Sequence, residues 1–566
     1  MDHRRARGRV ARRVDHAGER CVPVAADHHG PRRVGDRRRL PRSRAVRPCG
    51  VPRSRRRLSR RARARRRGDA GVGARMVGRG ADRVRAARRP RGLPAAARRA
   101  AAARPGLRVS RPDGSWRVSH PVSRTRGAPG RGGRSVARGL FAPGTSGMMD
   151  YNGYFSRAAA GMQESAIRKM GALGGRIPDL ISFAPGFPAA EMFAWDEFRD
   201  VAQTVLDGSD AAVLQYGPTR GYRPLVEALP QILGTRGIRA IPDDVIVTTG
   251  SQQALDLTAR VFIDPGAVVL VELPTYTGAI TAFRNAQAAL VGVRQDDAGV
   301  DLEDLDRVTL RERAAGRRIA FLYVVPNFQN PTGLLIGLEK RRRLLEWAAR
   351  RDVLIVEDDP YGALHFDDAA TAAETRPIKA DDRDGRVVYL SSFSKTVAPG
   401  FRVAWIAAPA AIVVKLEVAK QAADLCTGAL DQRIVYEVWK QGVIDARLPR
   451  LRAHYQEKRG VMERALRREL GDRVTWPAPK GGFFLWAAFP ERVNTDVLLA
   501  RAIANRVVYV AGSAFYVDGR TSHQARLAFS ASSAERIDEG IRRLAAAVRA
   551  ELAVTASVPS ASSQPA

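Results

Sequence analysis

The sequence has few cysteines and no long apolar run. Its three cysteines, Cys21, Cys49 and Cys426, are too few to form a disulfide framework in a chain of 566 residues. None has metal-ligand spacing, and we expect no metal site. No segment reaches the roughly 20 apolar residues of a membrane span, and the first residues lack the apolar core of a secretory signal. We therefore expect a soluble, cytoplasmic protein that does not bind membranes.

Lysine is scarce, with 9 lysines against 86 arginines, and the positive charge is concentrated at one end of the chain. The formal net charge is +37, of which residues 1–148 carry +35 through 43 arginines, no lysine and 8 acidic residues. A uniform excess of this size would indicate a nucleic-acid-binding protein. The remaining residues carry only +2, so the charge describes one segment and not the whole protein.

Three hypotheses account for residues 1–148, which are rich in Arg, Ala, Gly and Pro and show no sustained helical or strand period. Such a composition cannot bury enough apolar surface to offset its ordering entropy. The segment is a disordered basic arm that binds nucleic acid or acidic surfaces, a degraded winged-helix domain, or a wrongly extended reading frame. We favour the third hypothesis, with the native product starting at Met148 or Met149. An excess of arginine without lysine is what translation of GC-rich non-coding DNA gives.

The sequence after Met149 alternates apolar runs with amphipathic stretches. The apolar runs are nearly continuous in hydrophobicity, which is typical of strands in a sheet that is buried on both faces. The predicted strands are "DVIVTTG", "AVVLVELP", "RIAFLYVVP", "VLIVEDD", "RVVYLSSFS" and "RVAWIAAP". Helical patterns over Gln252–Ile263, Tyr276–Ala288 and Glu339–Arg351 lie between them. This alternation predicts an α/β fold with a mostly parallel sheet and helices on both faces.

Polar and aromatic residues follow these strands, and in open α/β sheets ligands bind at the carboxyl ends of the strands. The turn at Ser251 and Gln252 opens a helix whose first N–H groups suit an anion, although taken alone it is better explained as an ordinary capped helix start. Tyr276 is a stacking ring or a core residue. Asn330 lies in an Asn-Pro-Thr-Gly turn. Asp358 needs a partner at the mouth of a buried strand: a positive ring nitrogen, a salt bridge or a helix start.

The stretch "SSFSKTVAPGFRVAW" places Lys395 after another buried strand and Arg402 seven residues later. Partial desolvation favours the neutral, nucleophilic form of a lysine. An arginine could not replace Lys395, because a guanidinium stays protonated. Arg402 has the opposite property, a permanent charge with a planar fork that can grip a phosphate. Together the strand ends offer an anion cup, a stacking ring, hydroxyl-binding groups, a carboxylate and an amine nucleophile.

Six motifs occur in order after Met149: "QYGPTRGYRPL", "TTGSQQALDL", "NFQNPTG", "VEDDPYG", "SSFSKTVAPGFRVAW" and "ARLAFS". With them, residues from Met149 to about Val554 resemble a fold-type I, class I aminotransferase that depends on pyridoxal phosphate. Within this class they are most similar to the 2-aminoadipate, kynurenine and aromatic aminotransferases. The phosphate, ring, phenolic oxygen, ring nitrogen and aldehyde of that cofactor match the groups found at the strand ends.

The resemblance implies a large domain with a mostly parallel seven-stranded sheet and a smaller α+β domain. We expect an N-terminal segment of the small domain, with a substrate gate, over 149–200 and the large cofactor-binding domain over 201–440. The small domain follows over 441–554, closed by a helix over Ala534–Val554, and a disordered tail covers 555–566. The active unit implied is a homodimer with shared active sites.

The resemblance also implies roles for individual residues. Lys395 would link covalently to the cofactor and then shuttle a proton between the substrate Cα and the cofactor C4′. Asp358 would keep the ring nitrogen protonated, Asn330 and Tyr361 would hold the phenolic oxygen, and Tyr276 would stack on the ring. The phosphate ligands implied are Ser251, Gln252, Ser392, Arg402 and, from the neighbouring subunit, Tyr216.

Implied substrate contacts are Arg526 and Gly186, together with Asn330, at the α-carboxylate. Arg168, in a segment like the mobile one of aminoadipate enzymes, would approach a distal carboxylate; a solvated helix arginine is the alternative. Pro185 departs from the subgroup, which usually has glycine there, and Pro lacks an N–H. The expected donors are 2-aminoadipate, glutamate, aromatic and branched or long apolar amino acids, and the expected acceptor is 2-oxoglutarate.

Two alternatives stay open. A lyase or decarboxylase could use the same cofactor, because the reaction depends on which Cα bond stands perpendicular to the ring. A winged-helix transcription regulator fused to an aminotransferase-like domain would require residues 1–148 to fold and bind DNA. The missing apolar period of that segment argues against the regulator, so nucleic acid is an expected partner only if residues 1–148 are translated.

Overall fold

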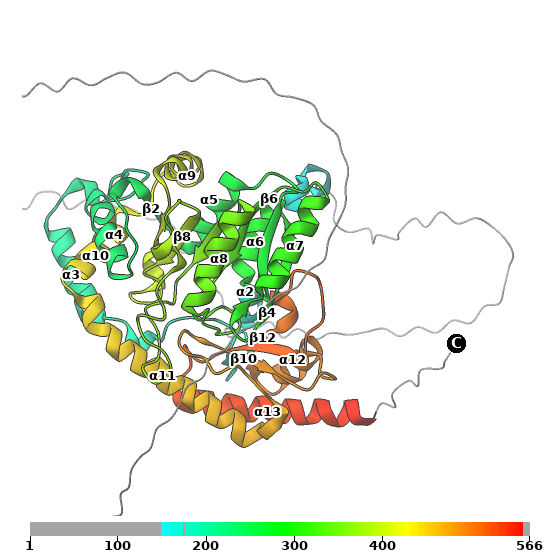
Figure 1. Cartoon of the computed structure of the whole chain (residues 1–566). Coiled ribbons are helices and arrows are strands. Elements are labelled where there is room, and N and C mark those ends of the chain that lie inside the picture. Colours follow the sequence, from blue (N-terminus) through cyan, green and yellow to red (C-terminus); the bar gives the residue numbers. More distant parts are fainter. Residues whose placement is uncertain (1–148, 163, 174–175, 558–566) are drawn as a thin grey trace, which may run out of the picture. The chain divides into compact units, whose positions relative to one another are not determined.

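The structure, a computed structural model, describes residues 149–162, 164–173 and 176–557 (Figure 1). Residues 1–148, on which the three hypotheses were stated, lie outside the described residues. Most of the predicted tail lies outside them as well. None of the helices in the described ranges is long and apolar enough to cross a membrane.

An eight-stranded sheet forms the centre of the large domain, in the order β2-β9-β8-β7-β6-β3-β4-β5. Its middle strands are parallel, whereas β9 runs antiparallel between β2 and β8, and β5 runs antiparallel to β4. The strands are β2 (Val245–Thr249), β3 (Val268–Leu273), β4 (Ala289–Asp296), β5 (Gly299–Val300), β6 (Ile319–Val324), β7 (Leu354–Asp358), β8 (Val387–Ser392) and β9 (Val403–Ala407). The two-residue β5 is the strand beyond the predicted seven.

Helices cover both faces of this sheet, because alternate residues of each buried strand point to opposite sides. One face packs on α5 (Ser251–Phe262), α6 (Thr277–Asn285) and α9 (Ala410–Ala423). The other face packs on helices from both halves of the domain. These are α3 (Trp195–Asp207), α4 (Arg223–Thr235), α7 (Leu302–Ala314), α8 (Leu338–Arg351) and α10 (Ala429–Lys440). The expected α/β fold with a large, mostly parallel sheet is thus confirmed.

A smaller unit is built from the end of the chain and a short N-terminal piece. Its antiparallel sheet has the order β10-β13-β12, and β1 (Ile181–Ser182) pairs parallel with β11 (Val507–Val508). The sheet strands are β10 (Phe484–Ala488), β12 (Val510–Ala511) and β13 (Gln524–Ala528). The helices are α11 (Val443–Leu470), α12 (Thr495–Ala504) and α13 (Ala534–Ser557), with the short α1 (Arg157–Ala160) and α2 (Ala166–Ala172) preceding β1.

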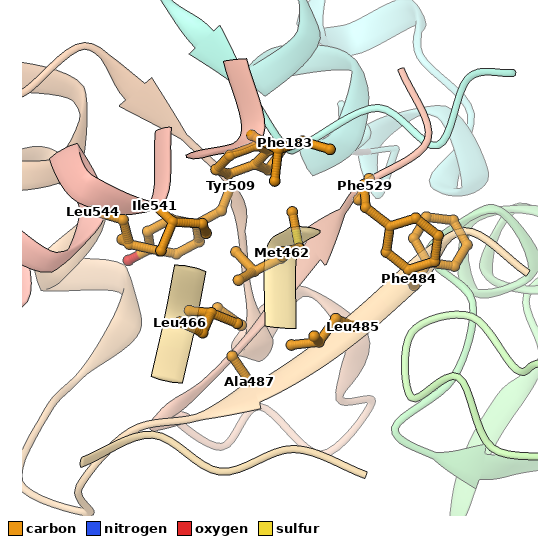
Figure 2. Close-up of a cluster of buried hydrophobic side chains, with 14 of the residues drawn as sticks. Phe183, Met462, Leu466, Phe484, Leu485, Ala487, Tyr509, Phe529, Ile541 and Leu544 are labelled. Atoms are coloured by element: carbon orange, nitrogen blue, oxygen red, sulfur yellow. The ribbon is translucent and has the colours of Figure 1, made fainter. Parts of the chain in front are cut away.

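The core of this unit joins segments far apart in the sequence. Figure 2 shows Phe183 beside β1 and Met462 and Leu466 on α11, packed with Ile541 and Leu544 on α13. The predicted closing helix exists as α13 and continues to Ser557, three residues past its predicted end and into the expected tail. Ile181 and Phe183 lie in this core, and the chain that follows Phe183 reaches the large domain at Gly186, whose carbonyl accepts a hydrogen bond from Lys395.

Candidate active site

Lys395 lies at the edge of the large sheet where the parallel strands end, three residues after β8. Its Nζ donates a hydrogen bond of 3.0 Å to the backbone carbonyl of Gly186. The amine also lies 5.9 Å from the ring centre of Tyr361 and 5.5 Å from that of Phe483. The amine is therefore enclosed by the sheet edge, the N-terminal segment and aromatic rings.

The ammonium form of Lys395 is disfavoured in this environment. Burial lowers its pKa from 10.5 to about 8, and the positive charges of Arg526 and Arg402 act in the same direction, while Asp358 opposes them. A neutral amine is the form that attacks a carbonyl carbon. The surroundings of Lys395 thus enlarge the fraction of its amine that is neutral and able to act as a nucleophile.

Asp358 ends β7 and is 3% exposed. The hydroxyl of Tyr323 on β6 donates a hydrogen bond of 2.8 Å to its Oδ2. Its Oδ1 is buried and has no hydrogen-bond partner in the described part of the chain. Burial raises the pKa of Asp358 to about 7, the Tyr323 hydrogen bond and Lys395 lower it, and Asp359 adds to the rise. A buried carboxylate with one free oxygen is suited to a cationic ring N–H.

Arg526 on β13 links the small unit to the turn that carries Asn330. The guanidinium is 1% exposed, donates 2.8 Å from Nη1 to Asn330 Oδ1, and donates from Nη2 to the carbonyl of Ala184. It also stacks 4.4 Å from the ring centre of Phe484. Burial lowers its pKa from 12.5 to about 10. Such a planar, desolvated cation, oriented on three sides, can bind a carboxylate with both donors.

Tyr276 and Gln252 approach each other where α5 and α6 begin. A Cβ added to Gly278 would lie 2.5 Å from the Tyr276 ring and 2.6 Å from the Gln252 Oε1 atom, so only glycine fits there. Gln252 Nε2 donates 3.0 Å to the Gly278 carbonyl, which ties the two helix starts together. Burial raises the pKa of Tyr276, and Asp358 adds to the rise. The ring is thereby kept neutral and fixed in position, as stacking requires.

Three of the predicted phosphate ligands lie at the start of α5: Ser251 and Gln252 are its first residues, and Arg402 lies against Gly250, which precedes it. Gly250 precedes this helix with φ +77°, and a Cβ there would collide with the guanidinium of Arg402. Arg402 donates from Nη1 to the Pro399 carbonyl at 3.3 Å, and its own φ of +54° turns the chain into β9. The Ser392 hydroxyl accepts a 2.8 Å hydrogen bond from the N–H of Ser394. A helix start beside a guanidinium is a strong anion site.

Two predicted residues lie farther out. Tyr216 is 78% exposed, and its backbone N–H contacts only the neighbouring Gln215 side chain among the described hydrogen bonds. Arg168, on α2, is exposed as well. Its positive charge nevertheless acts on the site, because it counters the burial that raises the pKa of Tyr276. The single chain therefore brings Arg168 toward the site and leaves Tyr216 in solvent.

Sequence reasoning missed a buried network beside Asp358. The carboxylate of Asp359 accepts hydrogen bonds from Arg236 (3.1 Å), Tyr389 (3.1 Å), Asn327 (2.9 Å) and the N–H of Gly362 (3.0 Å). Within this network, the bond from the Gly362 N–H ties the turn that carries Tyr361 to Asp359. Tyr323 was also missed, although strand alternation could have found it: residues 323 and 358 share one face of neighbouring strands.

These residues lie along one edge of the large sheet, and different residues suit different chemical groups of a ligand. The amine of Lys395 is suited to a carbonyl carbon, the free oxygen of Asp358 to a cationic ring nitrogen, and the guanidinium of Arg402 beside the start of α5 to a phosphate. The side chains of Asn330 and Tyr361 are both buried, and Asn330 lies near enough to Tyr361 to influence its pKa. The donor set fits a phosphorylated pyridine aldehyde, with a carboxylate-binding arginine beside it.

Comparison with known proteins points to the same chemistry. The family of class I and II aminotransferases matches residues 179–544. The chain is 40% identical over 392 residues to an aromatic-amino-acid aminotransferase of Thermococcus litoralis, covering 69% of this chain and 93% of the relative. It is 40% identical over 393 residues to a 2-aminoadipate transaminase of Thermus thermophilus, covering 69% and 96%.

A solved structure agrees with these relatives. The kynurenine aminotransferase of Pyrococcus horikoshii, determined with PMP, superposes with a TM-score of 0.68 and 37% identity over 71% of this chain and 98% of that chain. The fold is that of fold-type I aminotransferases, and the cofactor is pyridoxal phosphate. The chain belongs to the class I and II aminotransferase family and is a transaminase.

Proposed function

We propose that this transaminase moves the amino group of 2-aminoadipate, glutamate, an aromatic or a branched or long apolar amino acid to a 2-oxo acid, with 2-oxoglutarate as the main acceptor. The observation that supports it best is the buried amine of Lys395, whose pKa is lowered and on which the charges of both Asp358 and the buried Arg526 act. Bound pyridoxal phosphate supplies an aldehyde for the amine and a ring that accepts electrons.

The residues of this chain then divide the work. Lys395 would be the residue that holds the cofactor covalently, and its amine would be the base that moves a proton at the substrate Cα. Asp358 keeps the proton on the ring nitrogen, and Asn330 and Tyr361 hold the phenolic oxygen. Tyr276 stacks on the ring and excludes water from it. The phosphate is held by the N-terminal end of α5, at Ser251 and Gln252, with Ser392 and Arg402.

The substrate end rests on two arginines. Arg526 binds the α-carboxylate, helped by Asn330 and by the backbone of Gly186, and releases the carbonyl of Ala184 to do so. Arg168 approaches the distal carboxylate of 2-aminoadipate or glutamate, and its influence on Tyr276 supports a place near the site. As the resemblance to the aminoadipate enzymes implies, Arg168, on the short helix α2, would swing away when the substrate side chain is apolar.

We further propose a homodimer in which Tyr216 binds the phosphate of the partner subunit. Support comes from large apolar side chains that one chain leaves in solvent, which is costly over a wide patch. They lie in the N-terminal segment, in the 214–216 loop and on α9: Tyr154, Phe155, Met162, Leu214, Tyr216, Val414 and Val418. A cytoplasmic location stays a prediction.

The test is a donor screen with the full chain, pyridoxal phosphate and 2-oxoglutarate. We expect glutamate from 2-aminoadipate and from aromatic donors, with turnover lost in Lys395→Ala and retained in Lys415→Ala, whose lysine is exposed on α9. If none of the donors yields glutamate, the proposed substrates are wrong. Carbon dioxide or ammonia released in place of glutamate would favour the lyase or decarboxylase.

A further inference from the structure

We propose that Tyr323 is a positioning residue that orients Asp358 and holds it ionised, and so sets how firmly the cofactor's ring nitrogen keeps its proton. The inference rests on the proposed role of Asp358. Among the described residues, the Tyr323 hydroxyl is the one hydrogen-bond donor to the Asp358 side chain, at 2.8 Å.

Sheet register places the two residues together. Tyr323 on β6 pairs with Val356 on β7, so Asp358 stands two residues further along the neighbouring strand on the same face. Both side chains belong to the side of the sheet that packs on α5 and α6. The diagonal distance between such positions lies within reach of a tyrosine side chain.

Tyr323 is rigid and permanently protonated. Its side chain is fully buried, and its ring packs edge-on against Phe283 with ring centres 5.4 Å apart. Burial raises the pKa of Tyr323 well above its usual value, with the nearby Asp358 charge adding to the rise. The hydroxyl therefore keeps a proton that it can donate to the ionised carboxylate of Asp358, and the packing of its ring in the core holds it in place.

The consequence for Asp358 is a division between its two oxygens. Tyr323 occupies Oδ2, which leaves Oδ1 as the free acceptor toward the site. A hydrogen bond to the charged form of a carboxyl stabilises that form. Without it, burial and the charge of Asp359 would favour a protonated Asp358, which cannot hold a second proton on a ring nitrogen. The other charged or titratable groups that influence Asp358 are Lys395, Tyr276 and Tyr361.

Tyr389 offers a matched control. Its hydroxyl donates 3.1 Å to Asp359, one residue along, and its ring is buried like that of Tyr323. It lies on the opposite face of the sheet, in the core formed with α4 and α10. Asp359 keeps Arg236, Asn327 and the N–H of Gly362 when this hydroxyl is removed. Tyr389→Phe therefore removes a comparable buried hydrogen bond that does not touch Asp358.

The experiment compares Tyr323→Phe, Tyr389→Phe and Asp358→Asn in the full chain loaded with pyridoxal phosphate labelled with ¹⁵N in the ring. We expect Tyr323→Phe to move the ring ¹⁵N resonance toward the deprotonated position and to weaken cofactor binding roughly tenfold to a hundredfold, the size of a lost hydrogen bond to a charged group. Tyr389→Phe should match the wild type in both readouts. Thermal unfolding of both tyrosine variants checks that each one folds.

Each other outcome has a distinct meaning. If Asp358→Asn shifts the resonance and Tyr323→Phe does not, the inference about Tyr323 is wrong while the role of Asp358 stands. If both tyrosine variants shift it equally, the effect is a general loss of packing and the inference is also wrong. If Asp358→Asn leaves the resonance unchanged, the proposed role of Asp358 fails, and the inference about Tyr323 fails with it.

Discussion

The amine of Lys395 should titrate far below an ordinary lysine in the cofactor-free protein. Burial, Arg526 and Arg402 bring its pKa to about 8 against the opposing charge of Asp358. At pH 7 such a pKa leaves about one amine in ten neutral, whereas an ordinary lysine leaves roughly one in three thousand. The site therefore raises the reactive fraction roughly 300-fold before any cofactor binds.

The assay is a short pulse of an amine-directed acylating reagent on the cofactor-free full chain between pH 6 and 11. Mass spectrometry of the peptide that contains Lys395 gives the extent of labelling, and a lysine in a short unstructured peptide gives the ordinary midpoint. We expect a labelling midpoint near pH 8. Arg526→Gln should raise the midpoint part of the way back, because burial is the larger cause, and Asp358→Asn should lower it.

The lowered pKa of Lys395 also makes the free energy of unfolding depend on pH. Between about pH 8 and 10.5 the unfolded chain binds more protons at this lysine than the folded chain, so its contribution to the free energy of unfolding rises with pH across that window. A labelling midpoint equal to that of the unstructured peptide, in the wild type and both variants, would refute the claim that the site activates the amine.

Three further predictions concern the supports of the site. Gly278→Ala should push the Tyr276 ring and Gln252 aside and so weaken cofactor binding. The control is Gly337→Ala, where a Cβ meets nothing within 4 Å and binding should not change. Equal cofactor affinities of the two variants in a fluorescence titration would contradict this prediction. Glu272 accepts from Val325 N–H, Gln295 and Gln329, so Glu272→Gln turns an N–H toward a donor and should cost about 1–3 kcal/mol in urea unfolding. Burial raises the pKa of Glu272 to about 7, so between pH 4.5 and 7 the folded chain binds more protons at this residue than the unfolded chain. The contribution of Glu272 to the free energy of unfolding therefore falls as the pH rises through this window, and Glu272→Gln should remove that fall. Arg236→Met leaves the buried Asp359 without its cation and should cost about 3–5 kcal/mol, and an unchanged unfolding midpoint would show that the other donors suffice.

Much of the fold could be predicted because its strands are buried on both faces. Six continuous apolar runs marked β2, β3, β6, β7, β8 and β9, and the polar residues that follow four of them converge on one edge. The half-buried β4 was not expected, because Gly292, Arg294 and Gln295 interrupt its apolar character. The direction of β9 was not predictable either, since hydrophobicity does not distinguish a parallel from an antiparallel strand.

The contacts that tune the site were beyond the sequence. The hydrogen bond from Arg526 to Asn330 joins residues 196 positions apart, and the carbonyl of Gly186 meets Lys395 across 209. No local pattern encodes such pairs, which arise only when the small unit packs near the sheet edge. Tyr323 is the exception, because its place two positions behind Asp358 on a neighbouring strand follows from strand alternation once the strand order is known.

The most direct test of the account is to trap the cofactor on the protein. The full chain is incubated with pyridoxal phosphate, reduced with borohydride and digested, and each of its nine lysines is inspected by mass spectrometry. We predict a pyridoxyl group on Lys395 and on none of the others, with the label lost in Lys395→Ala. A label on another lysine, or none at all in a protein that binds the cofactor, would contradict the central claim.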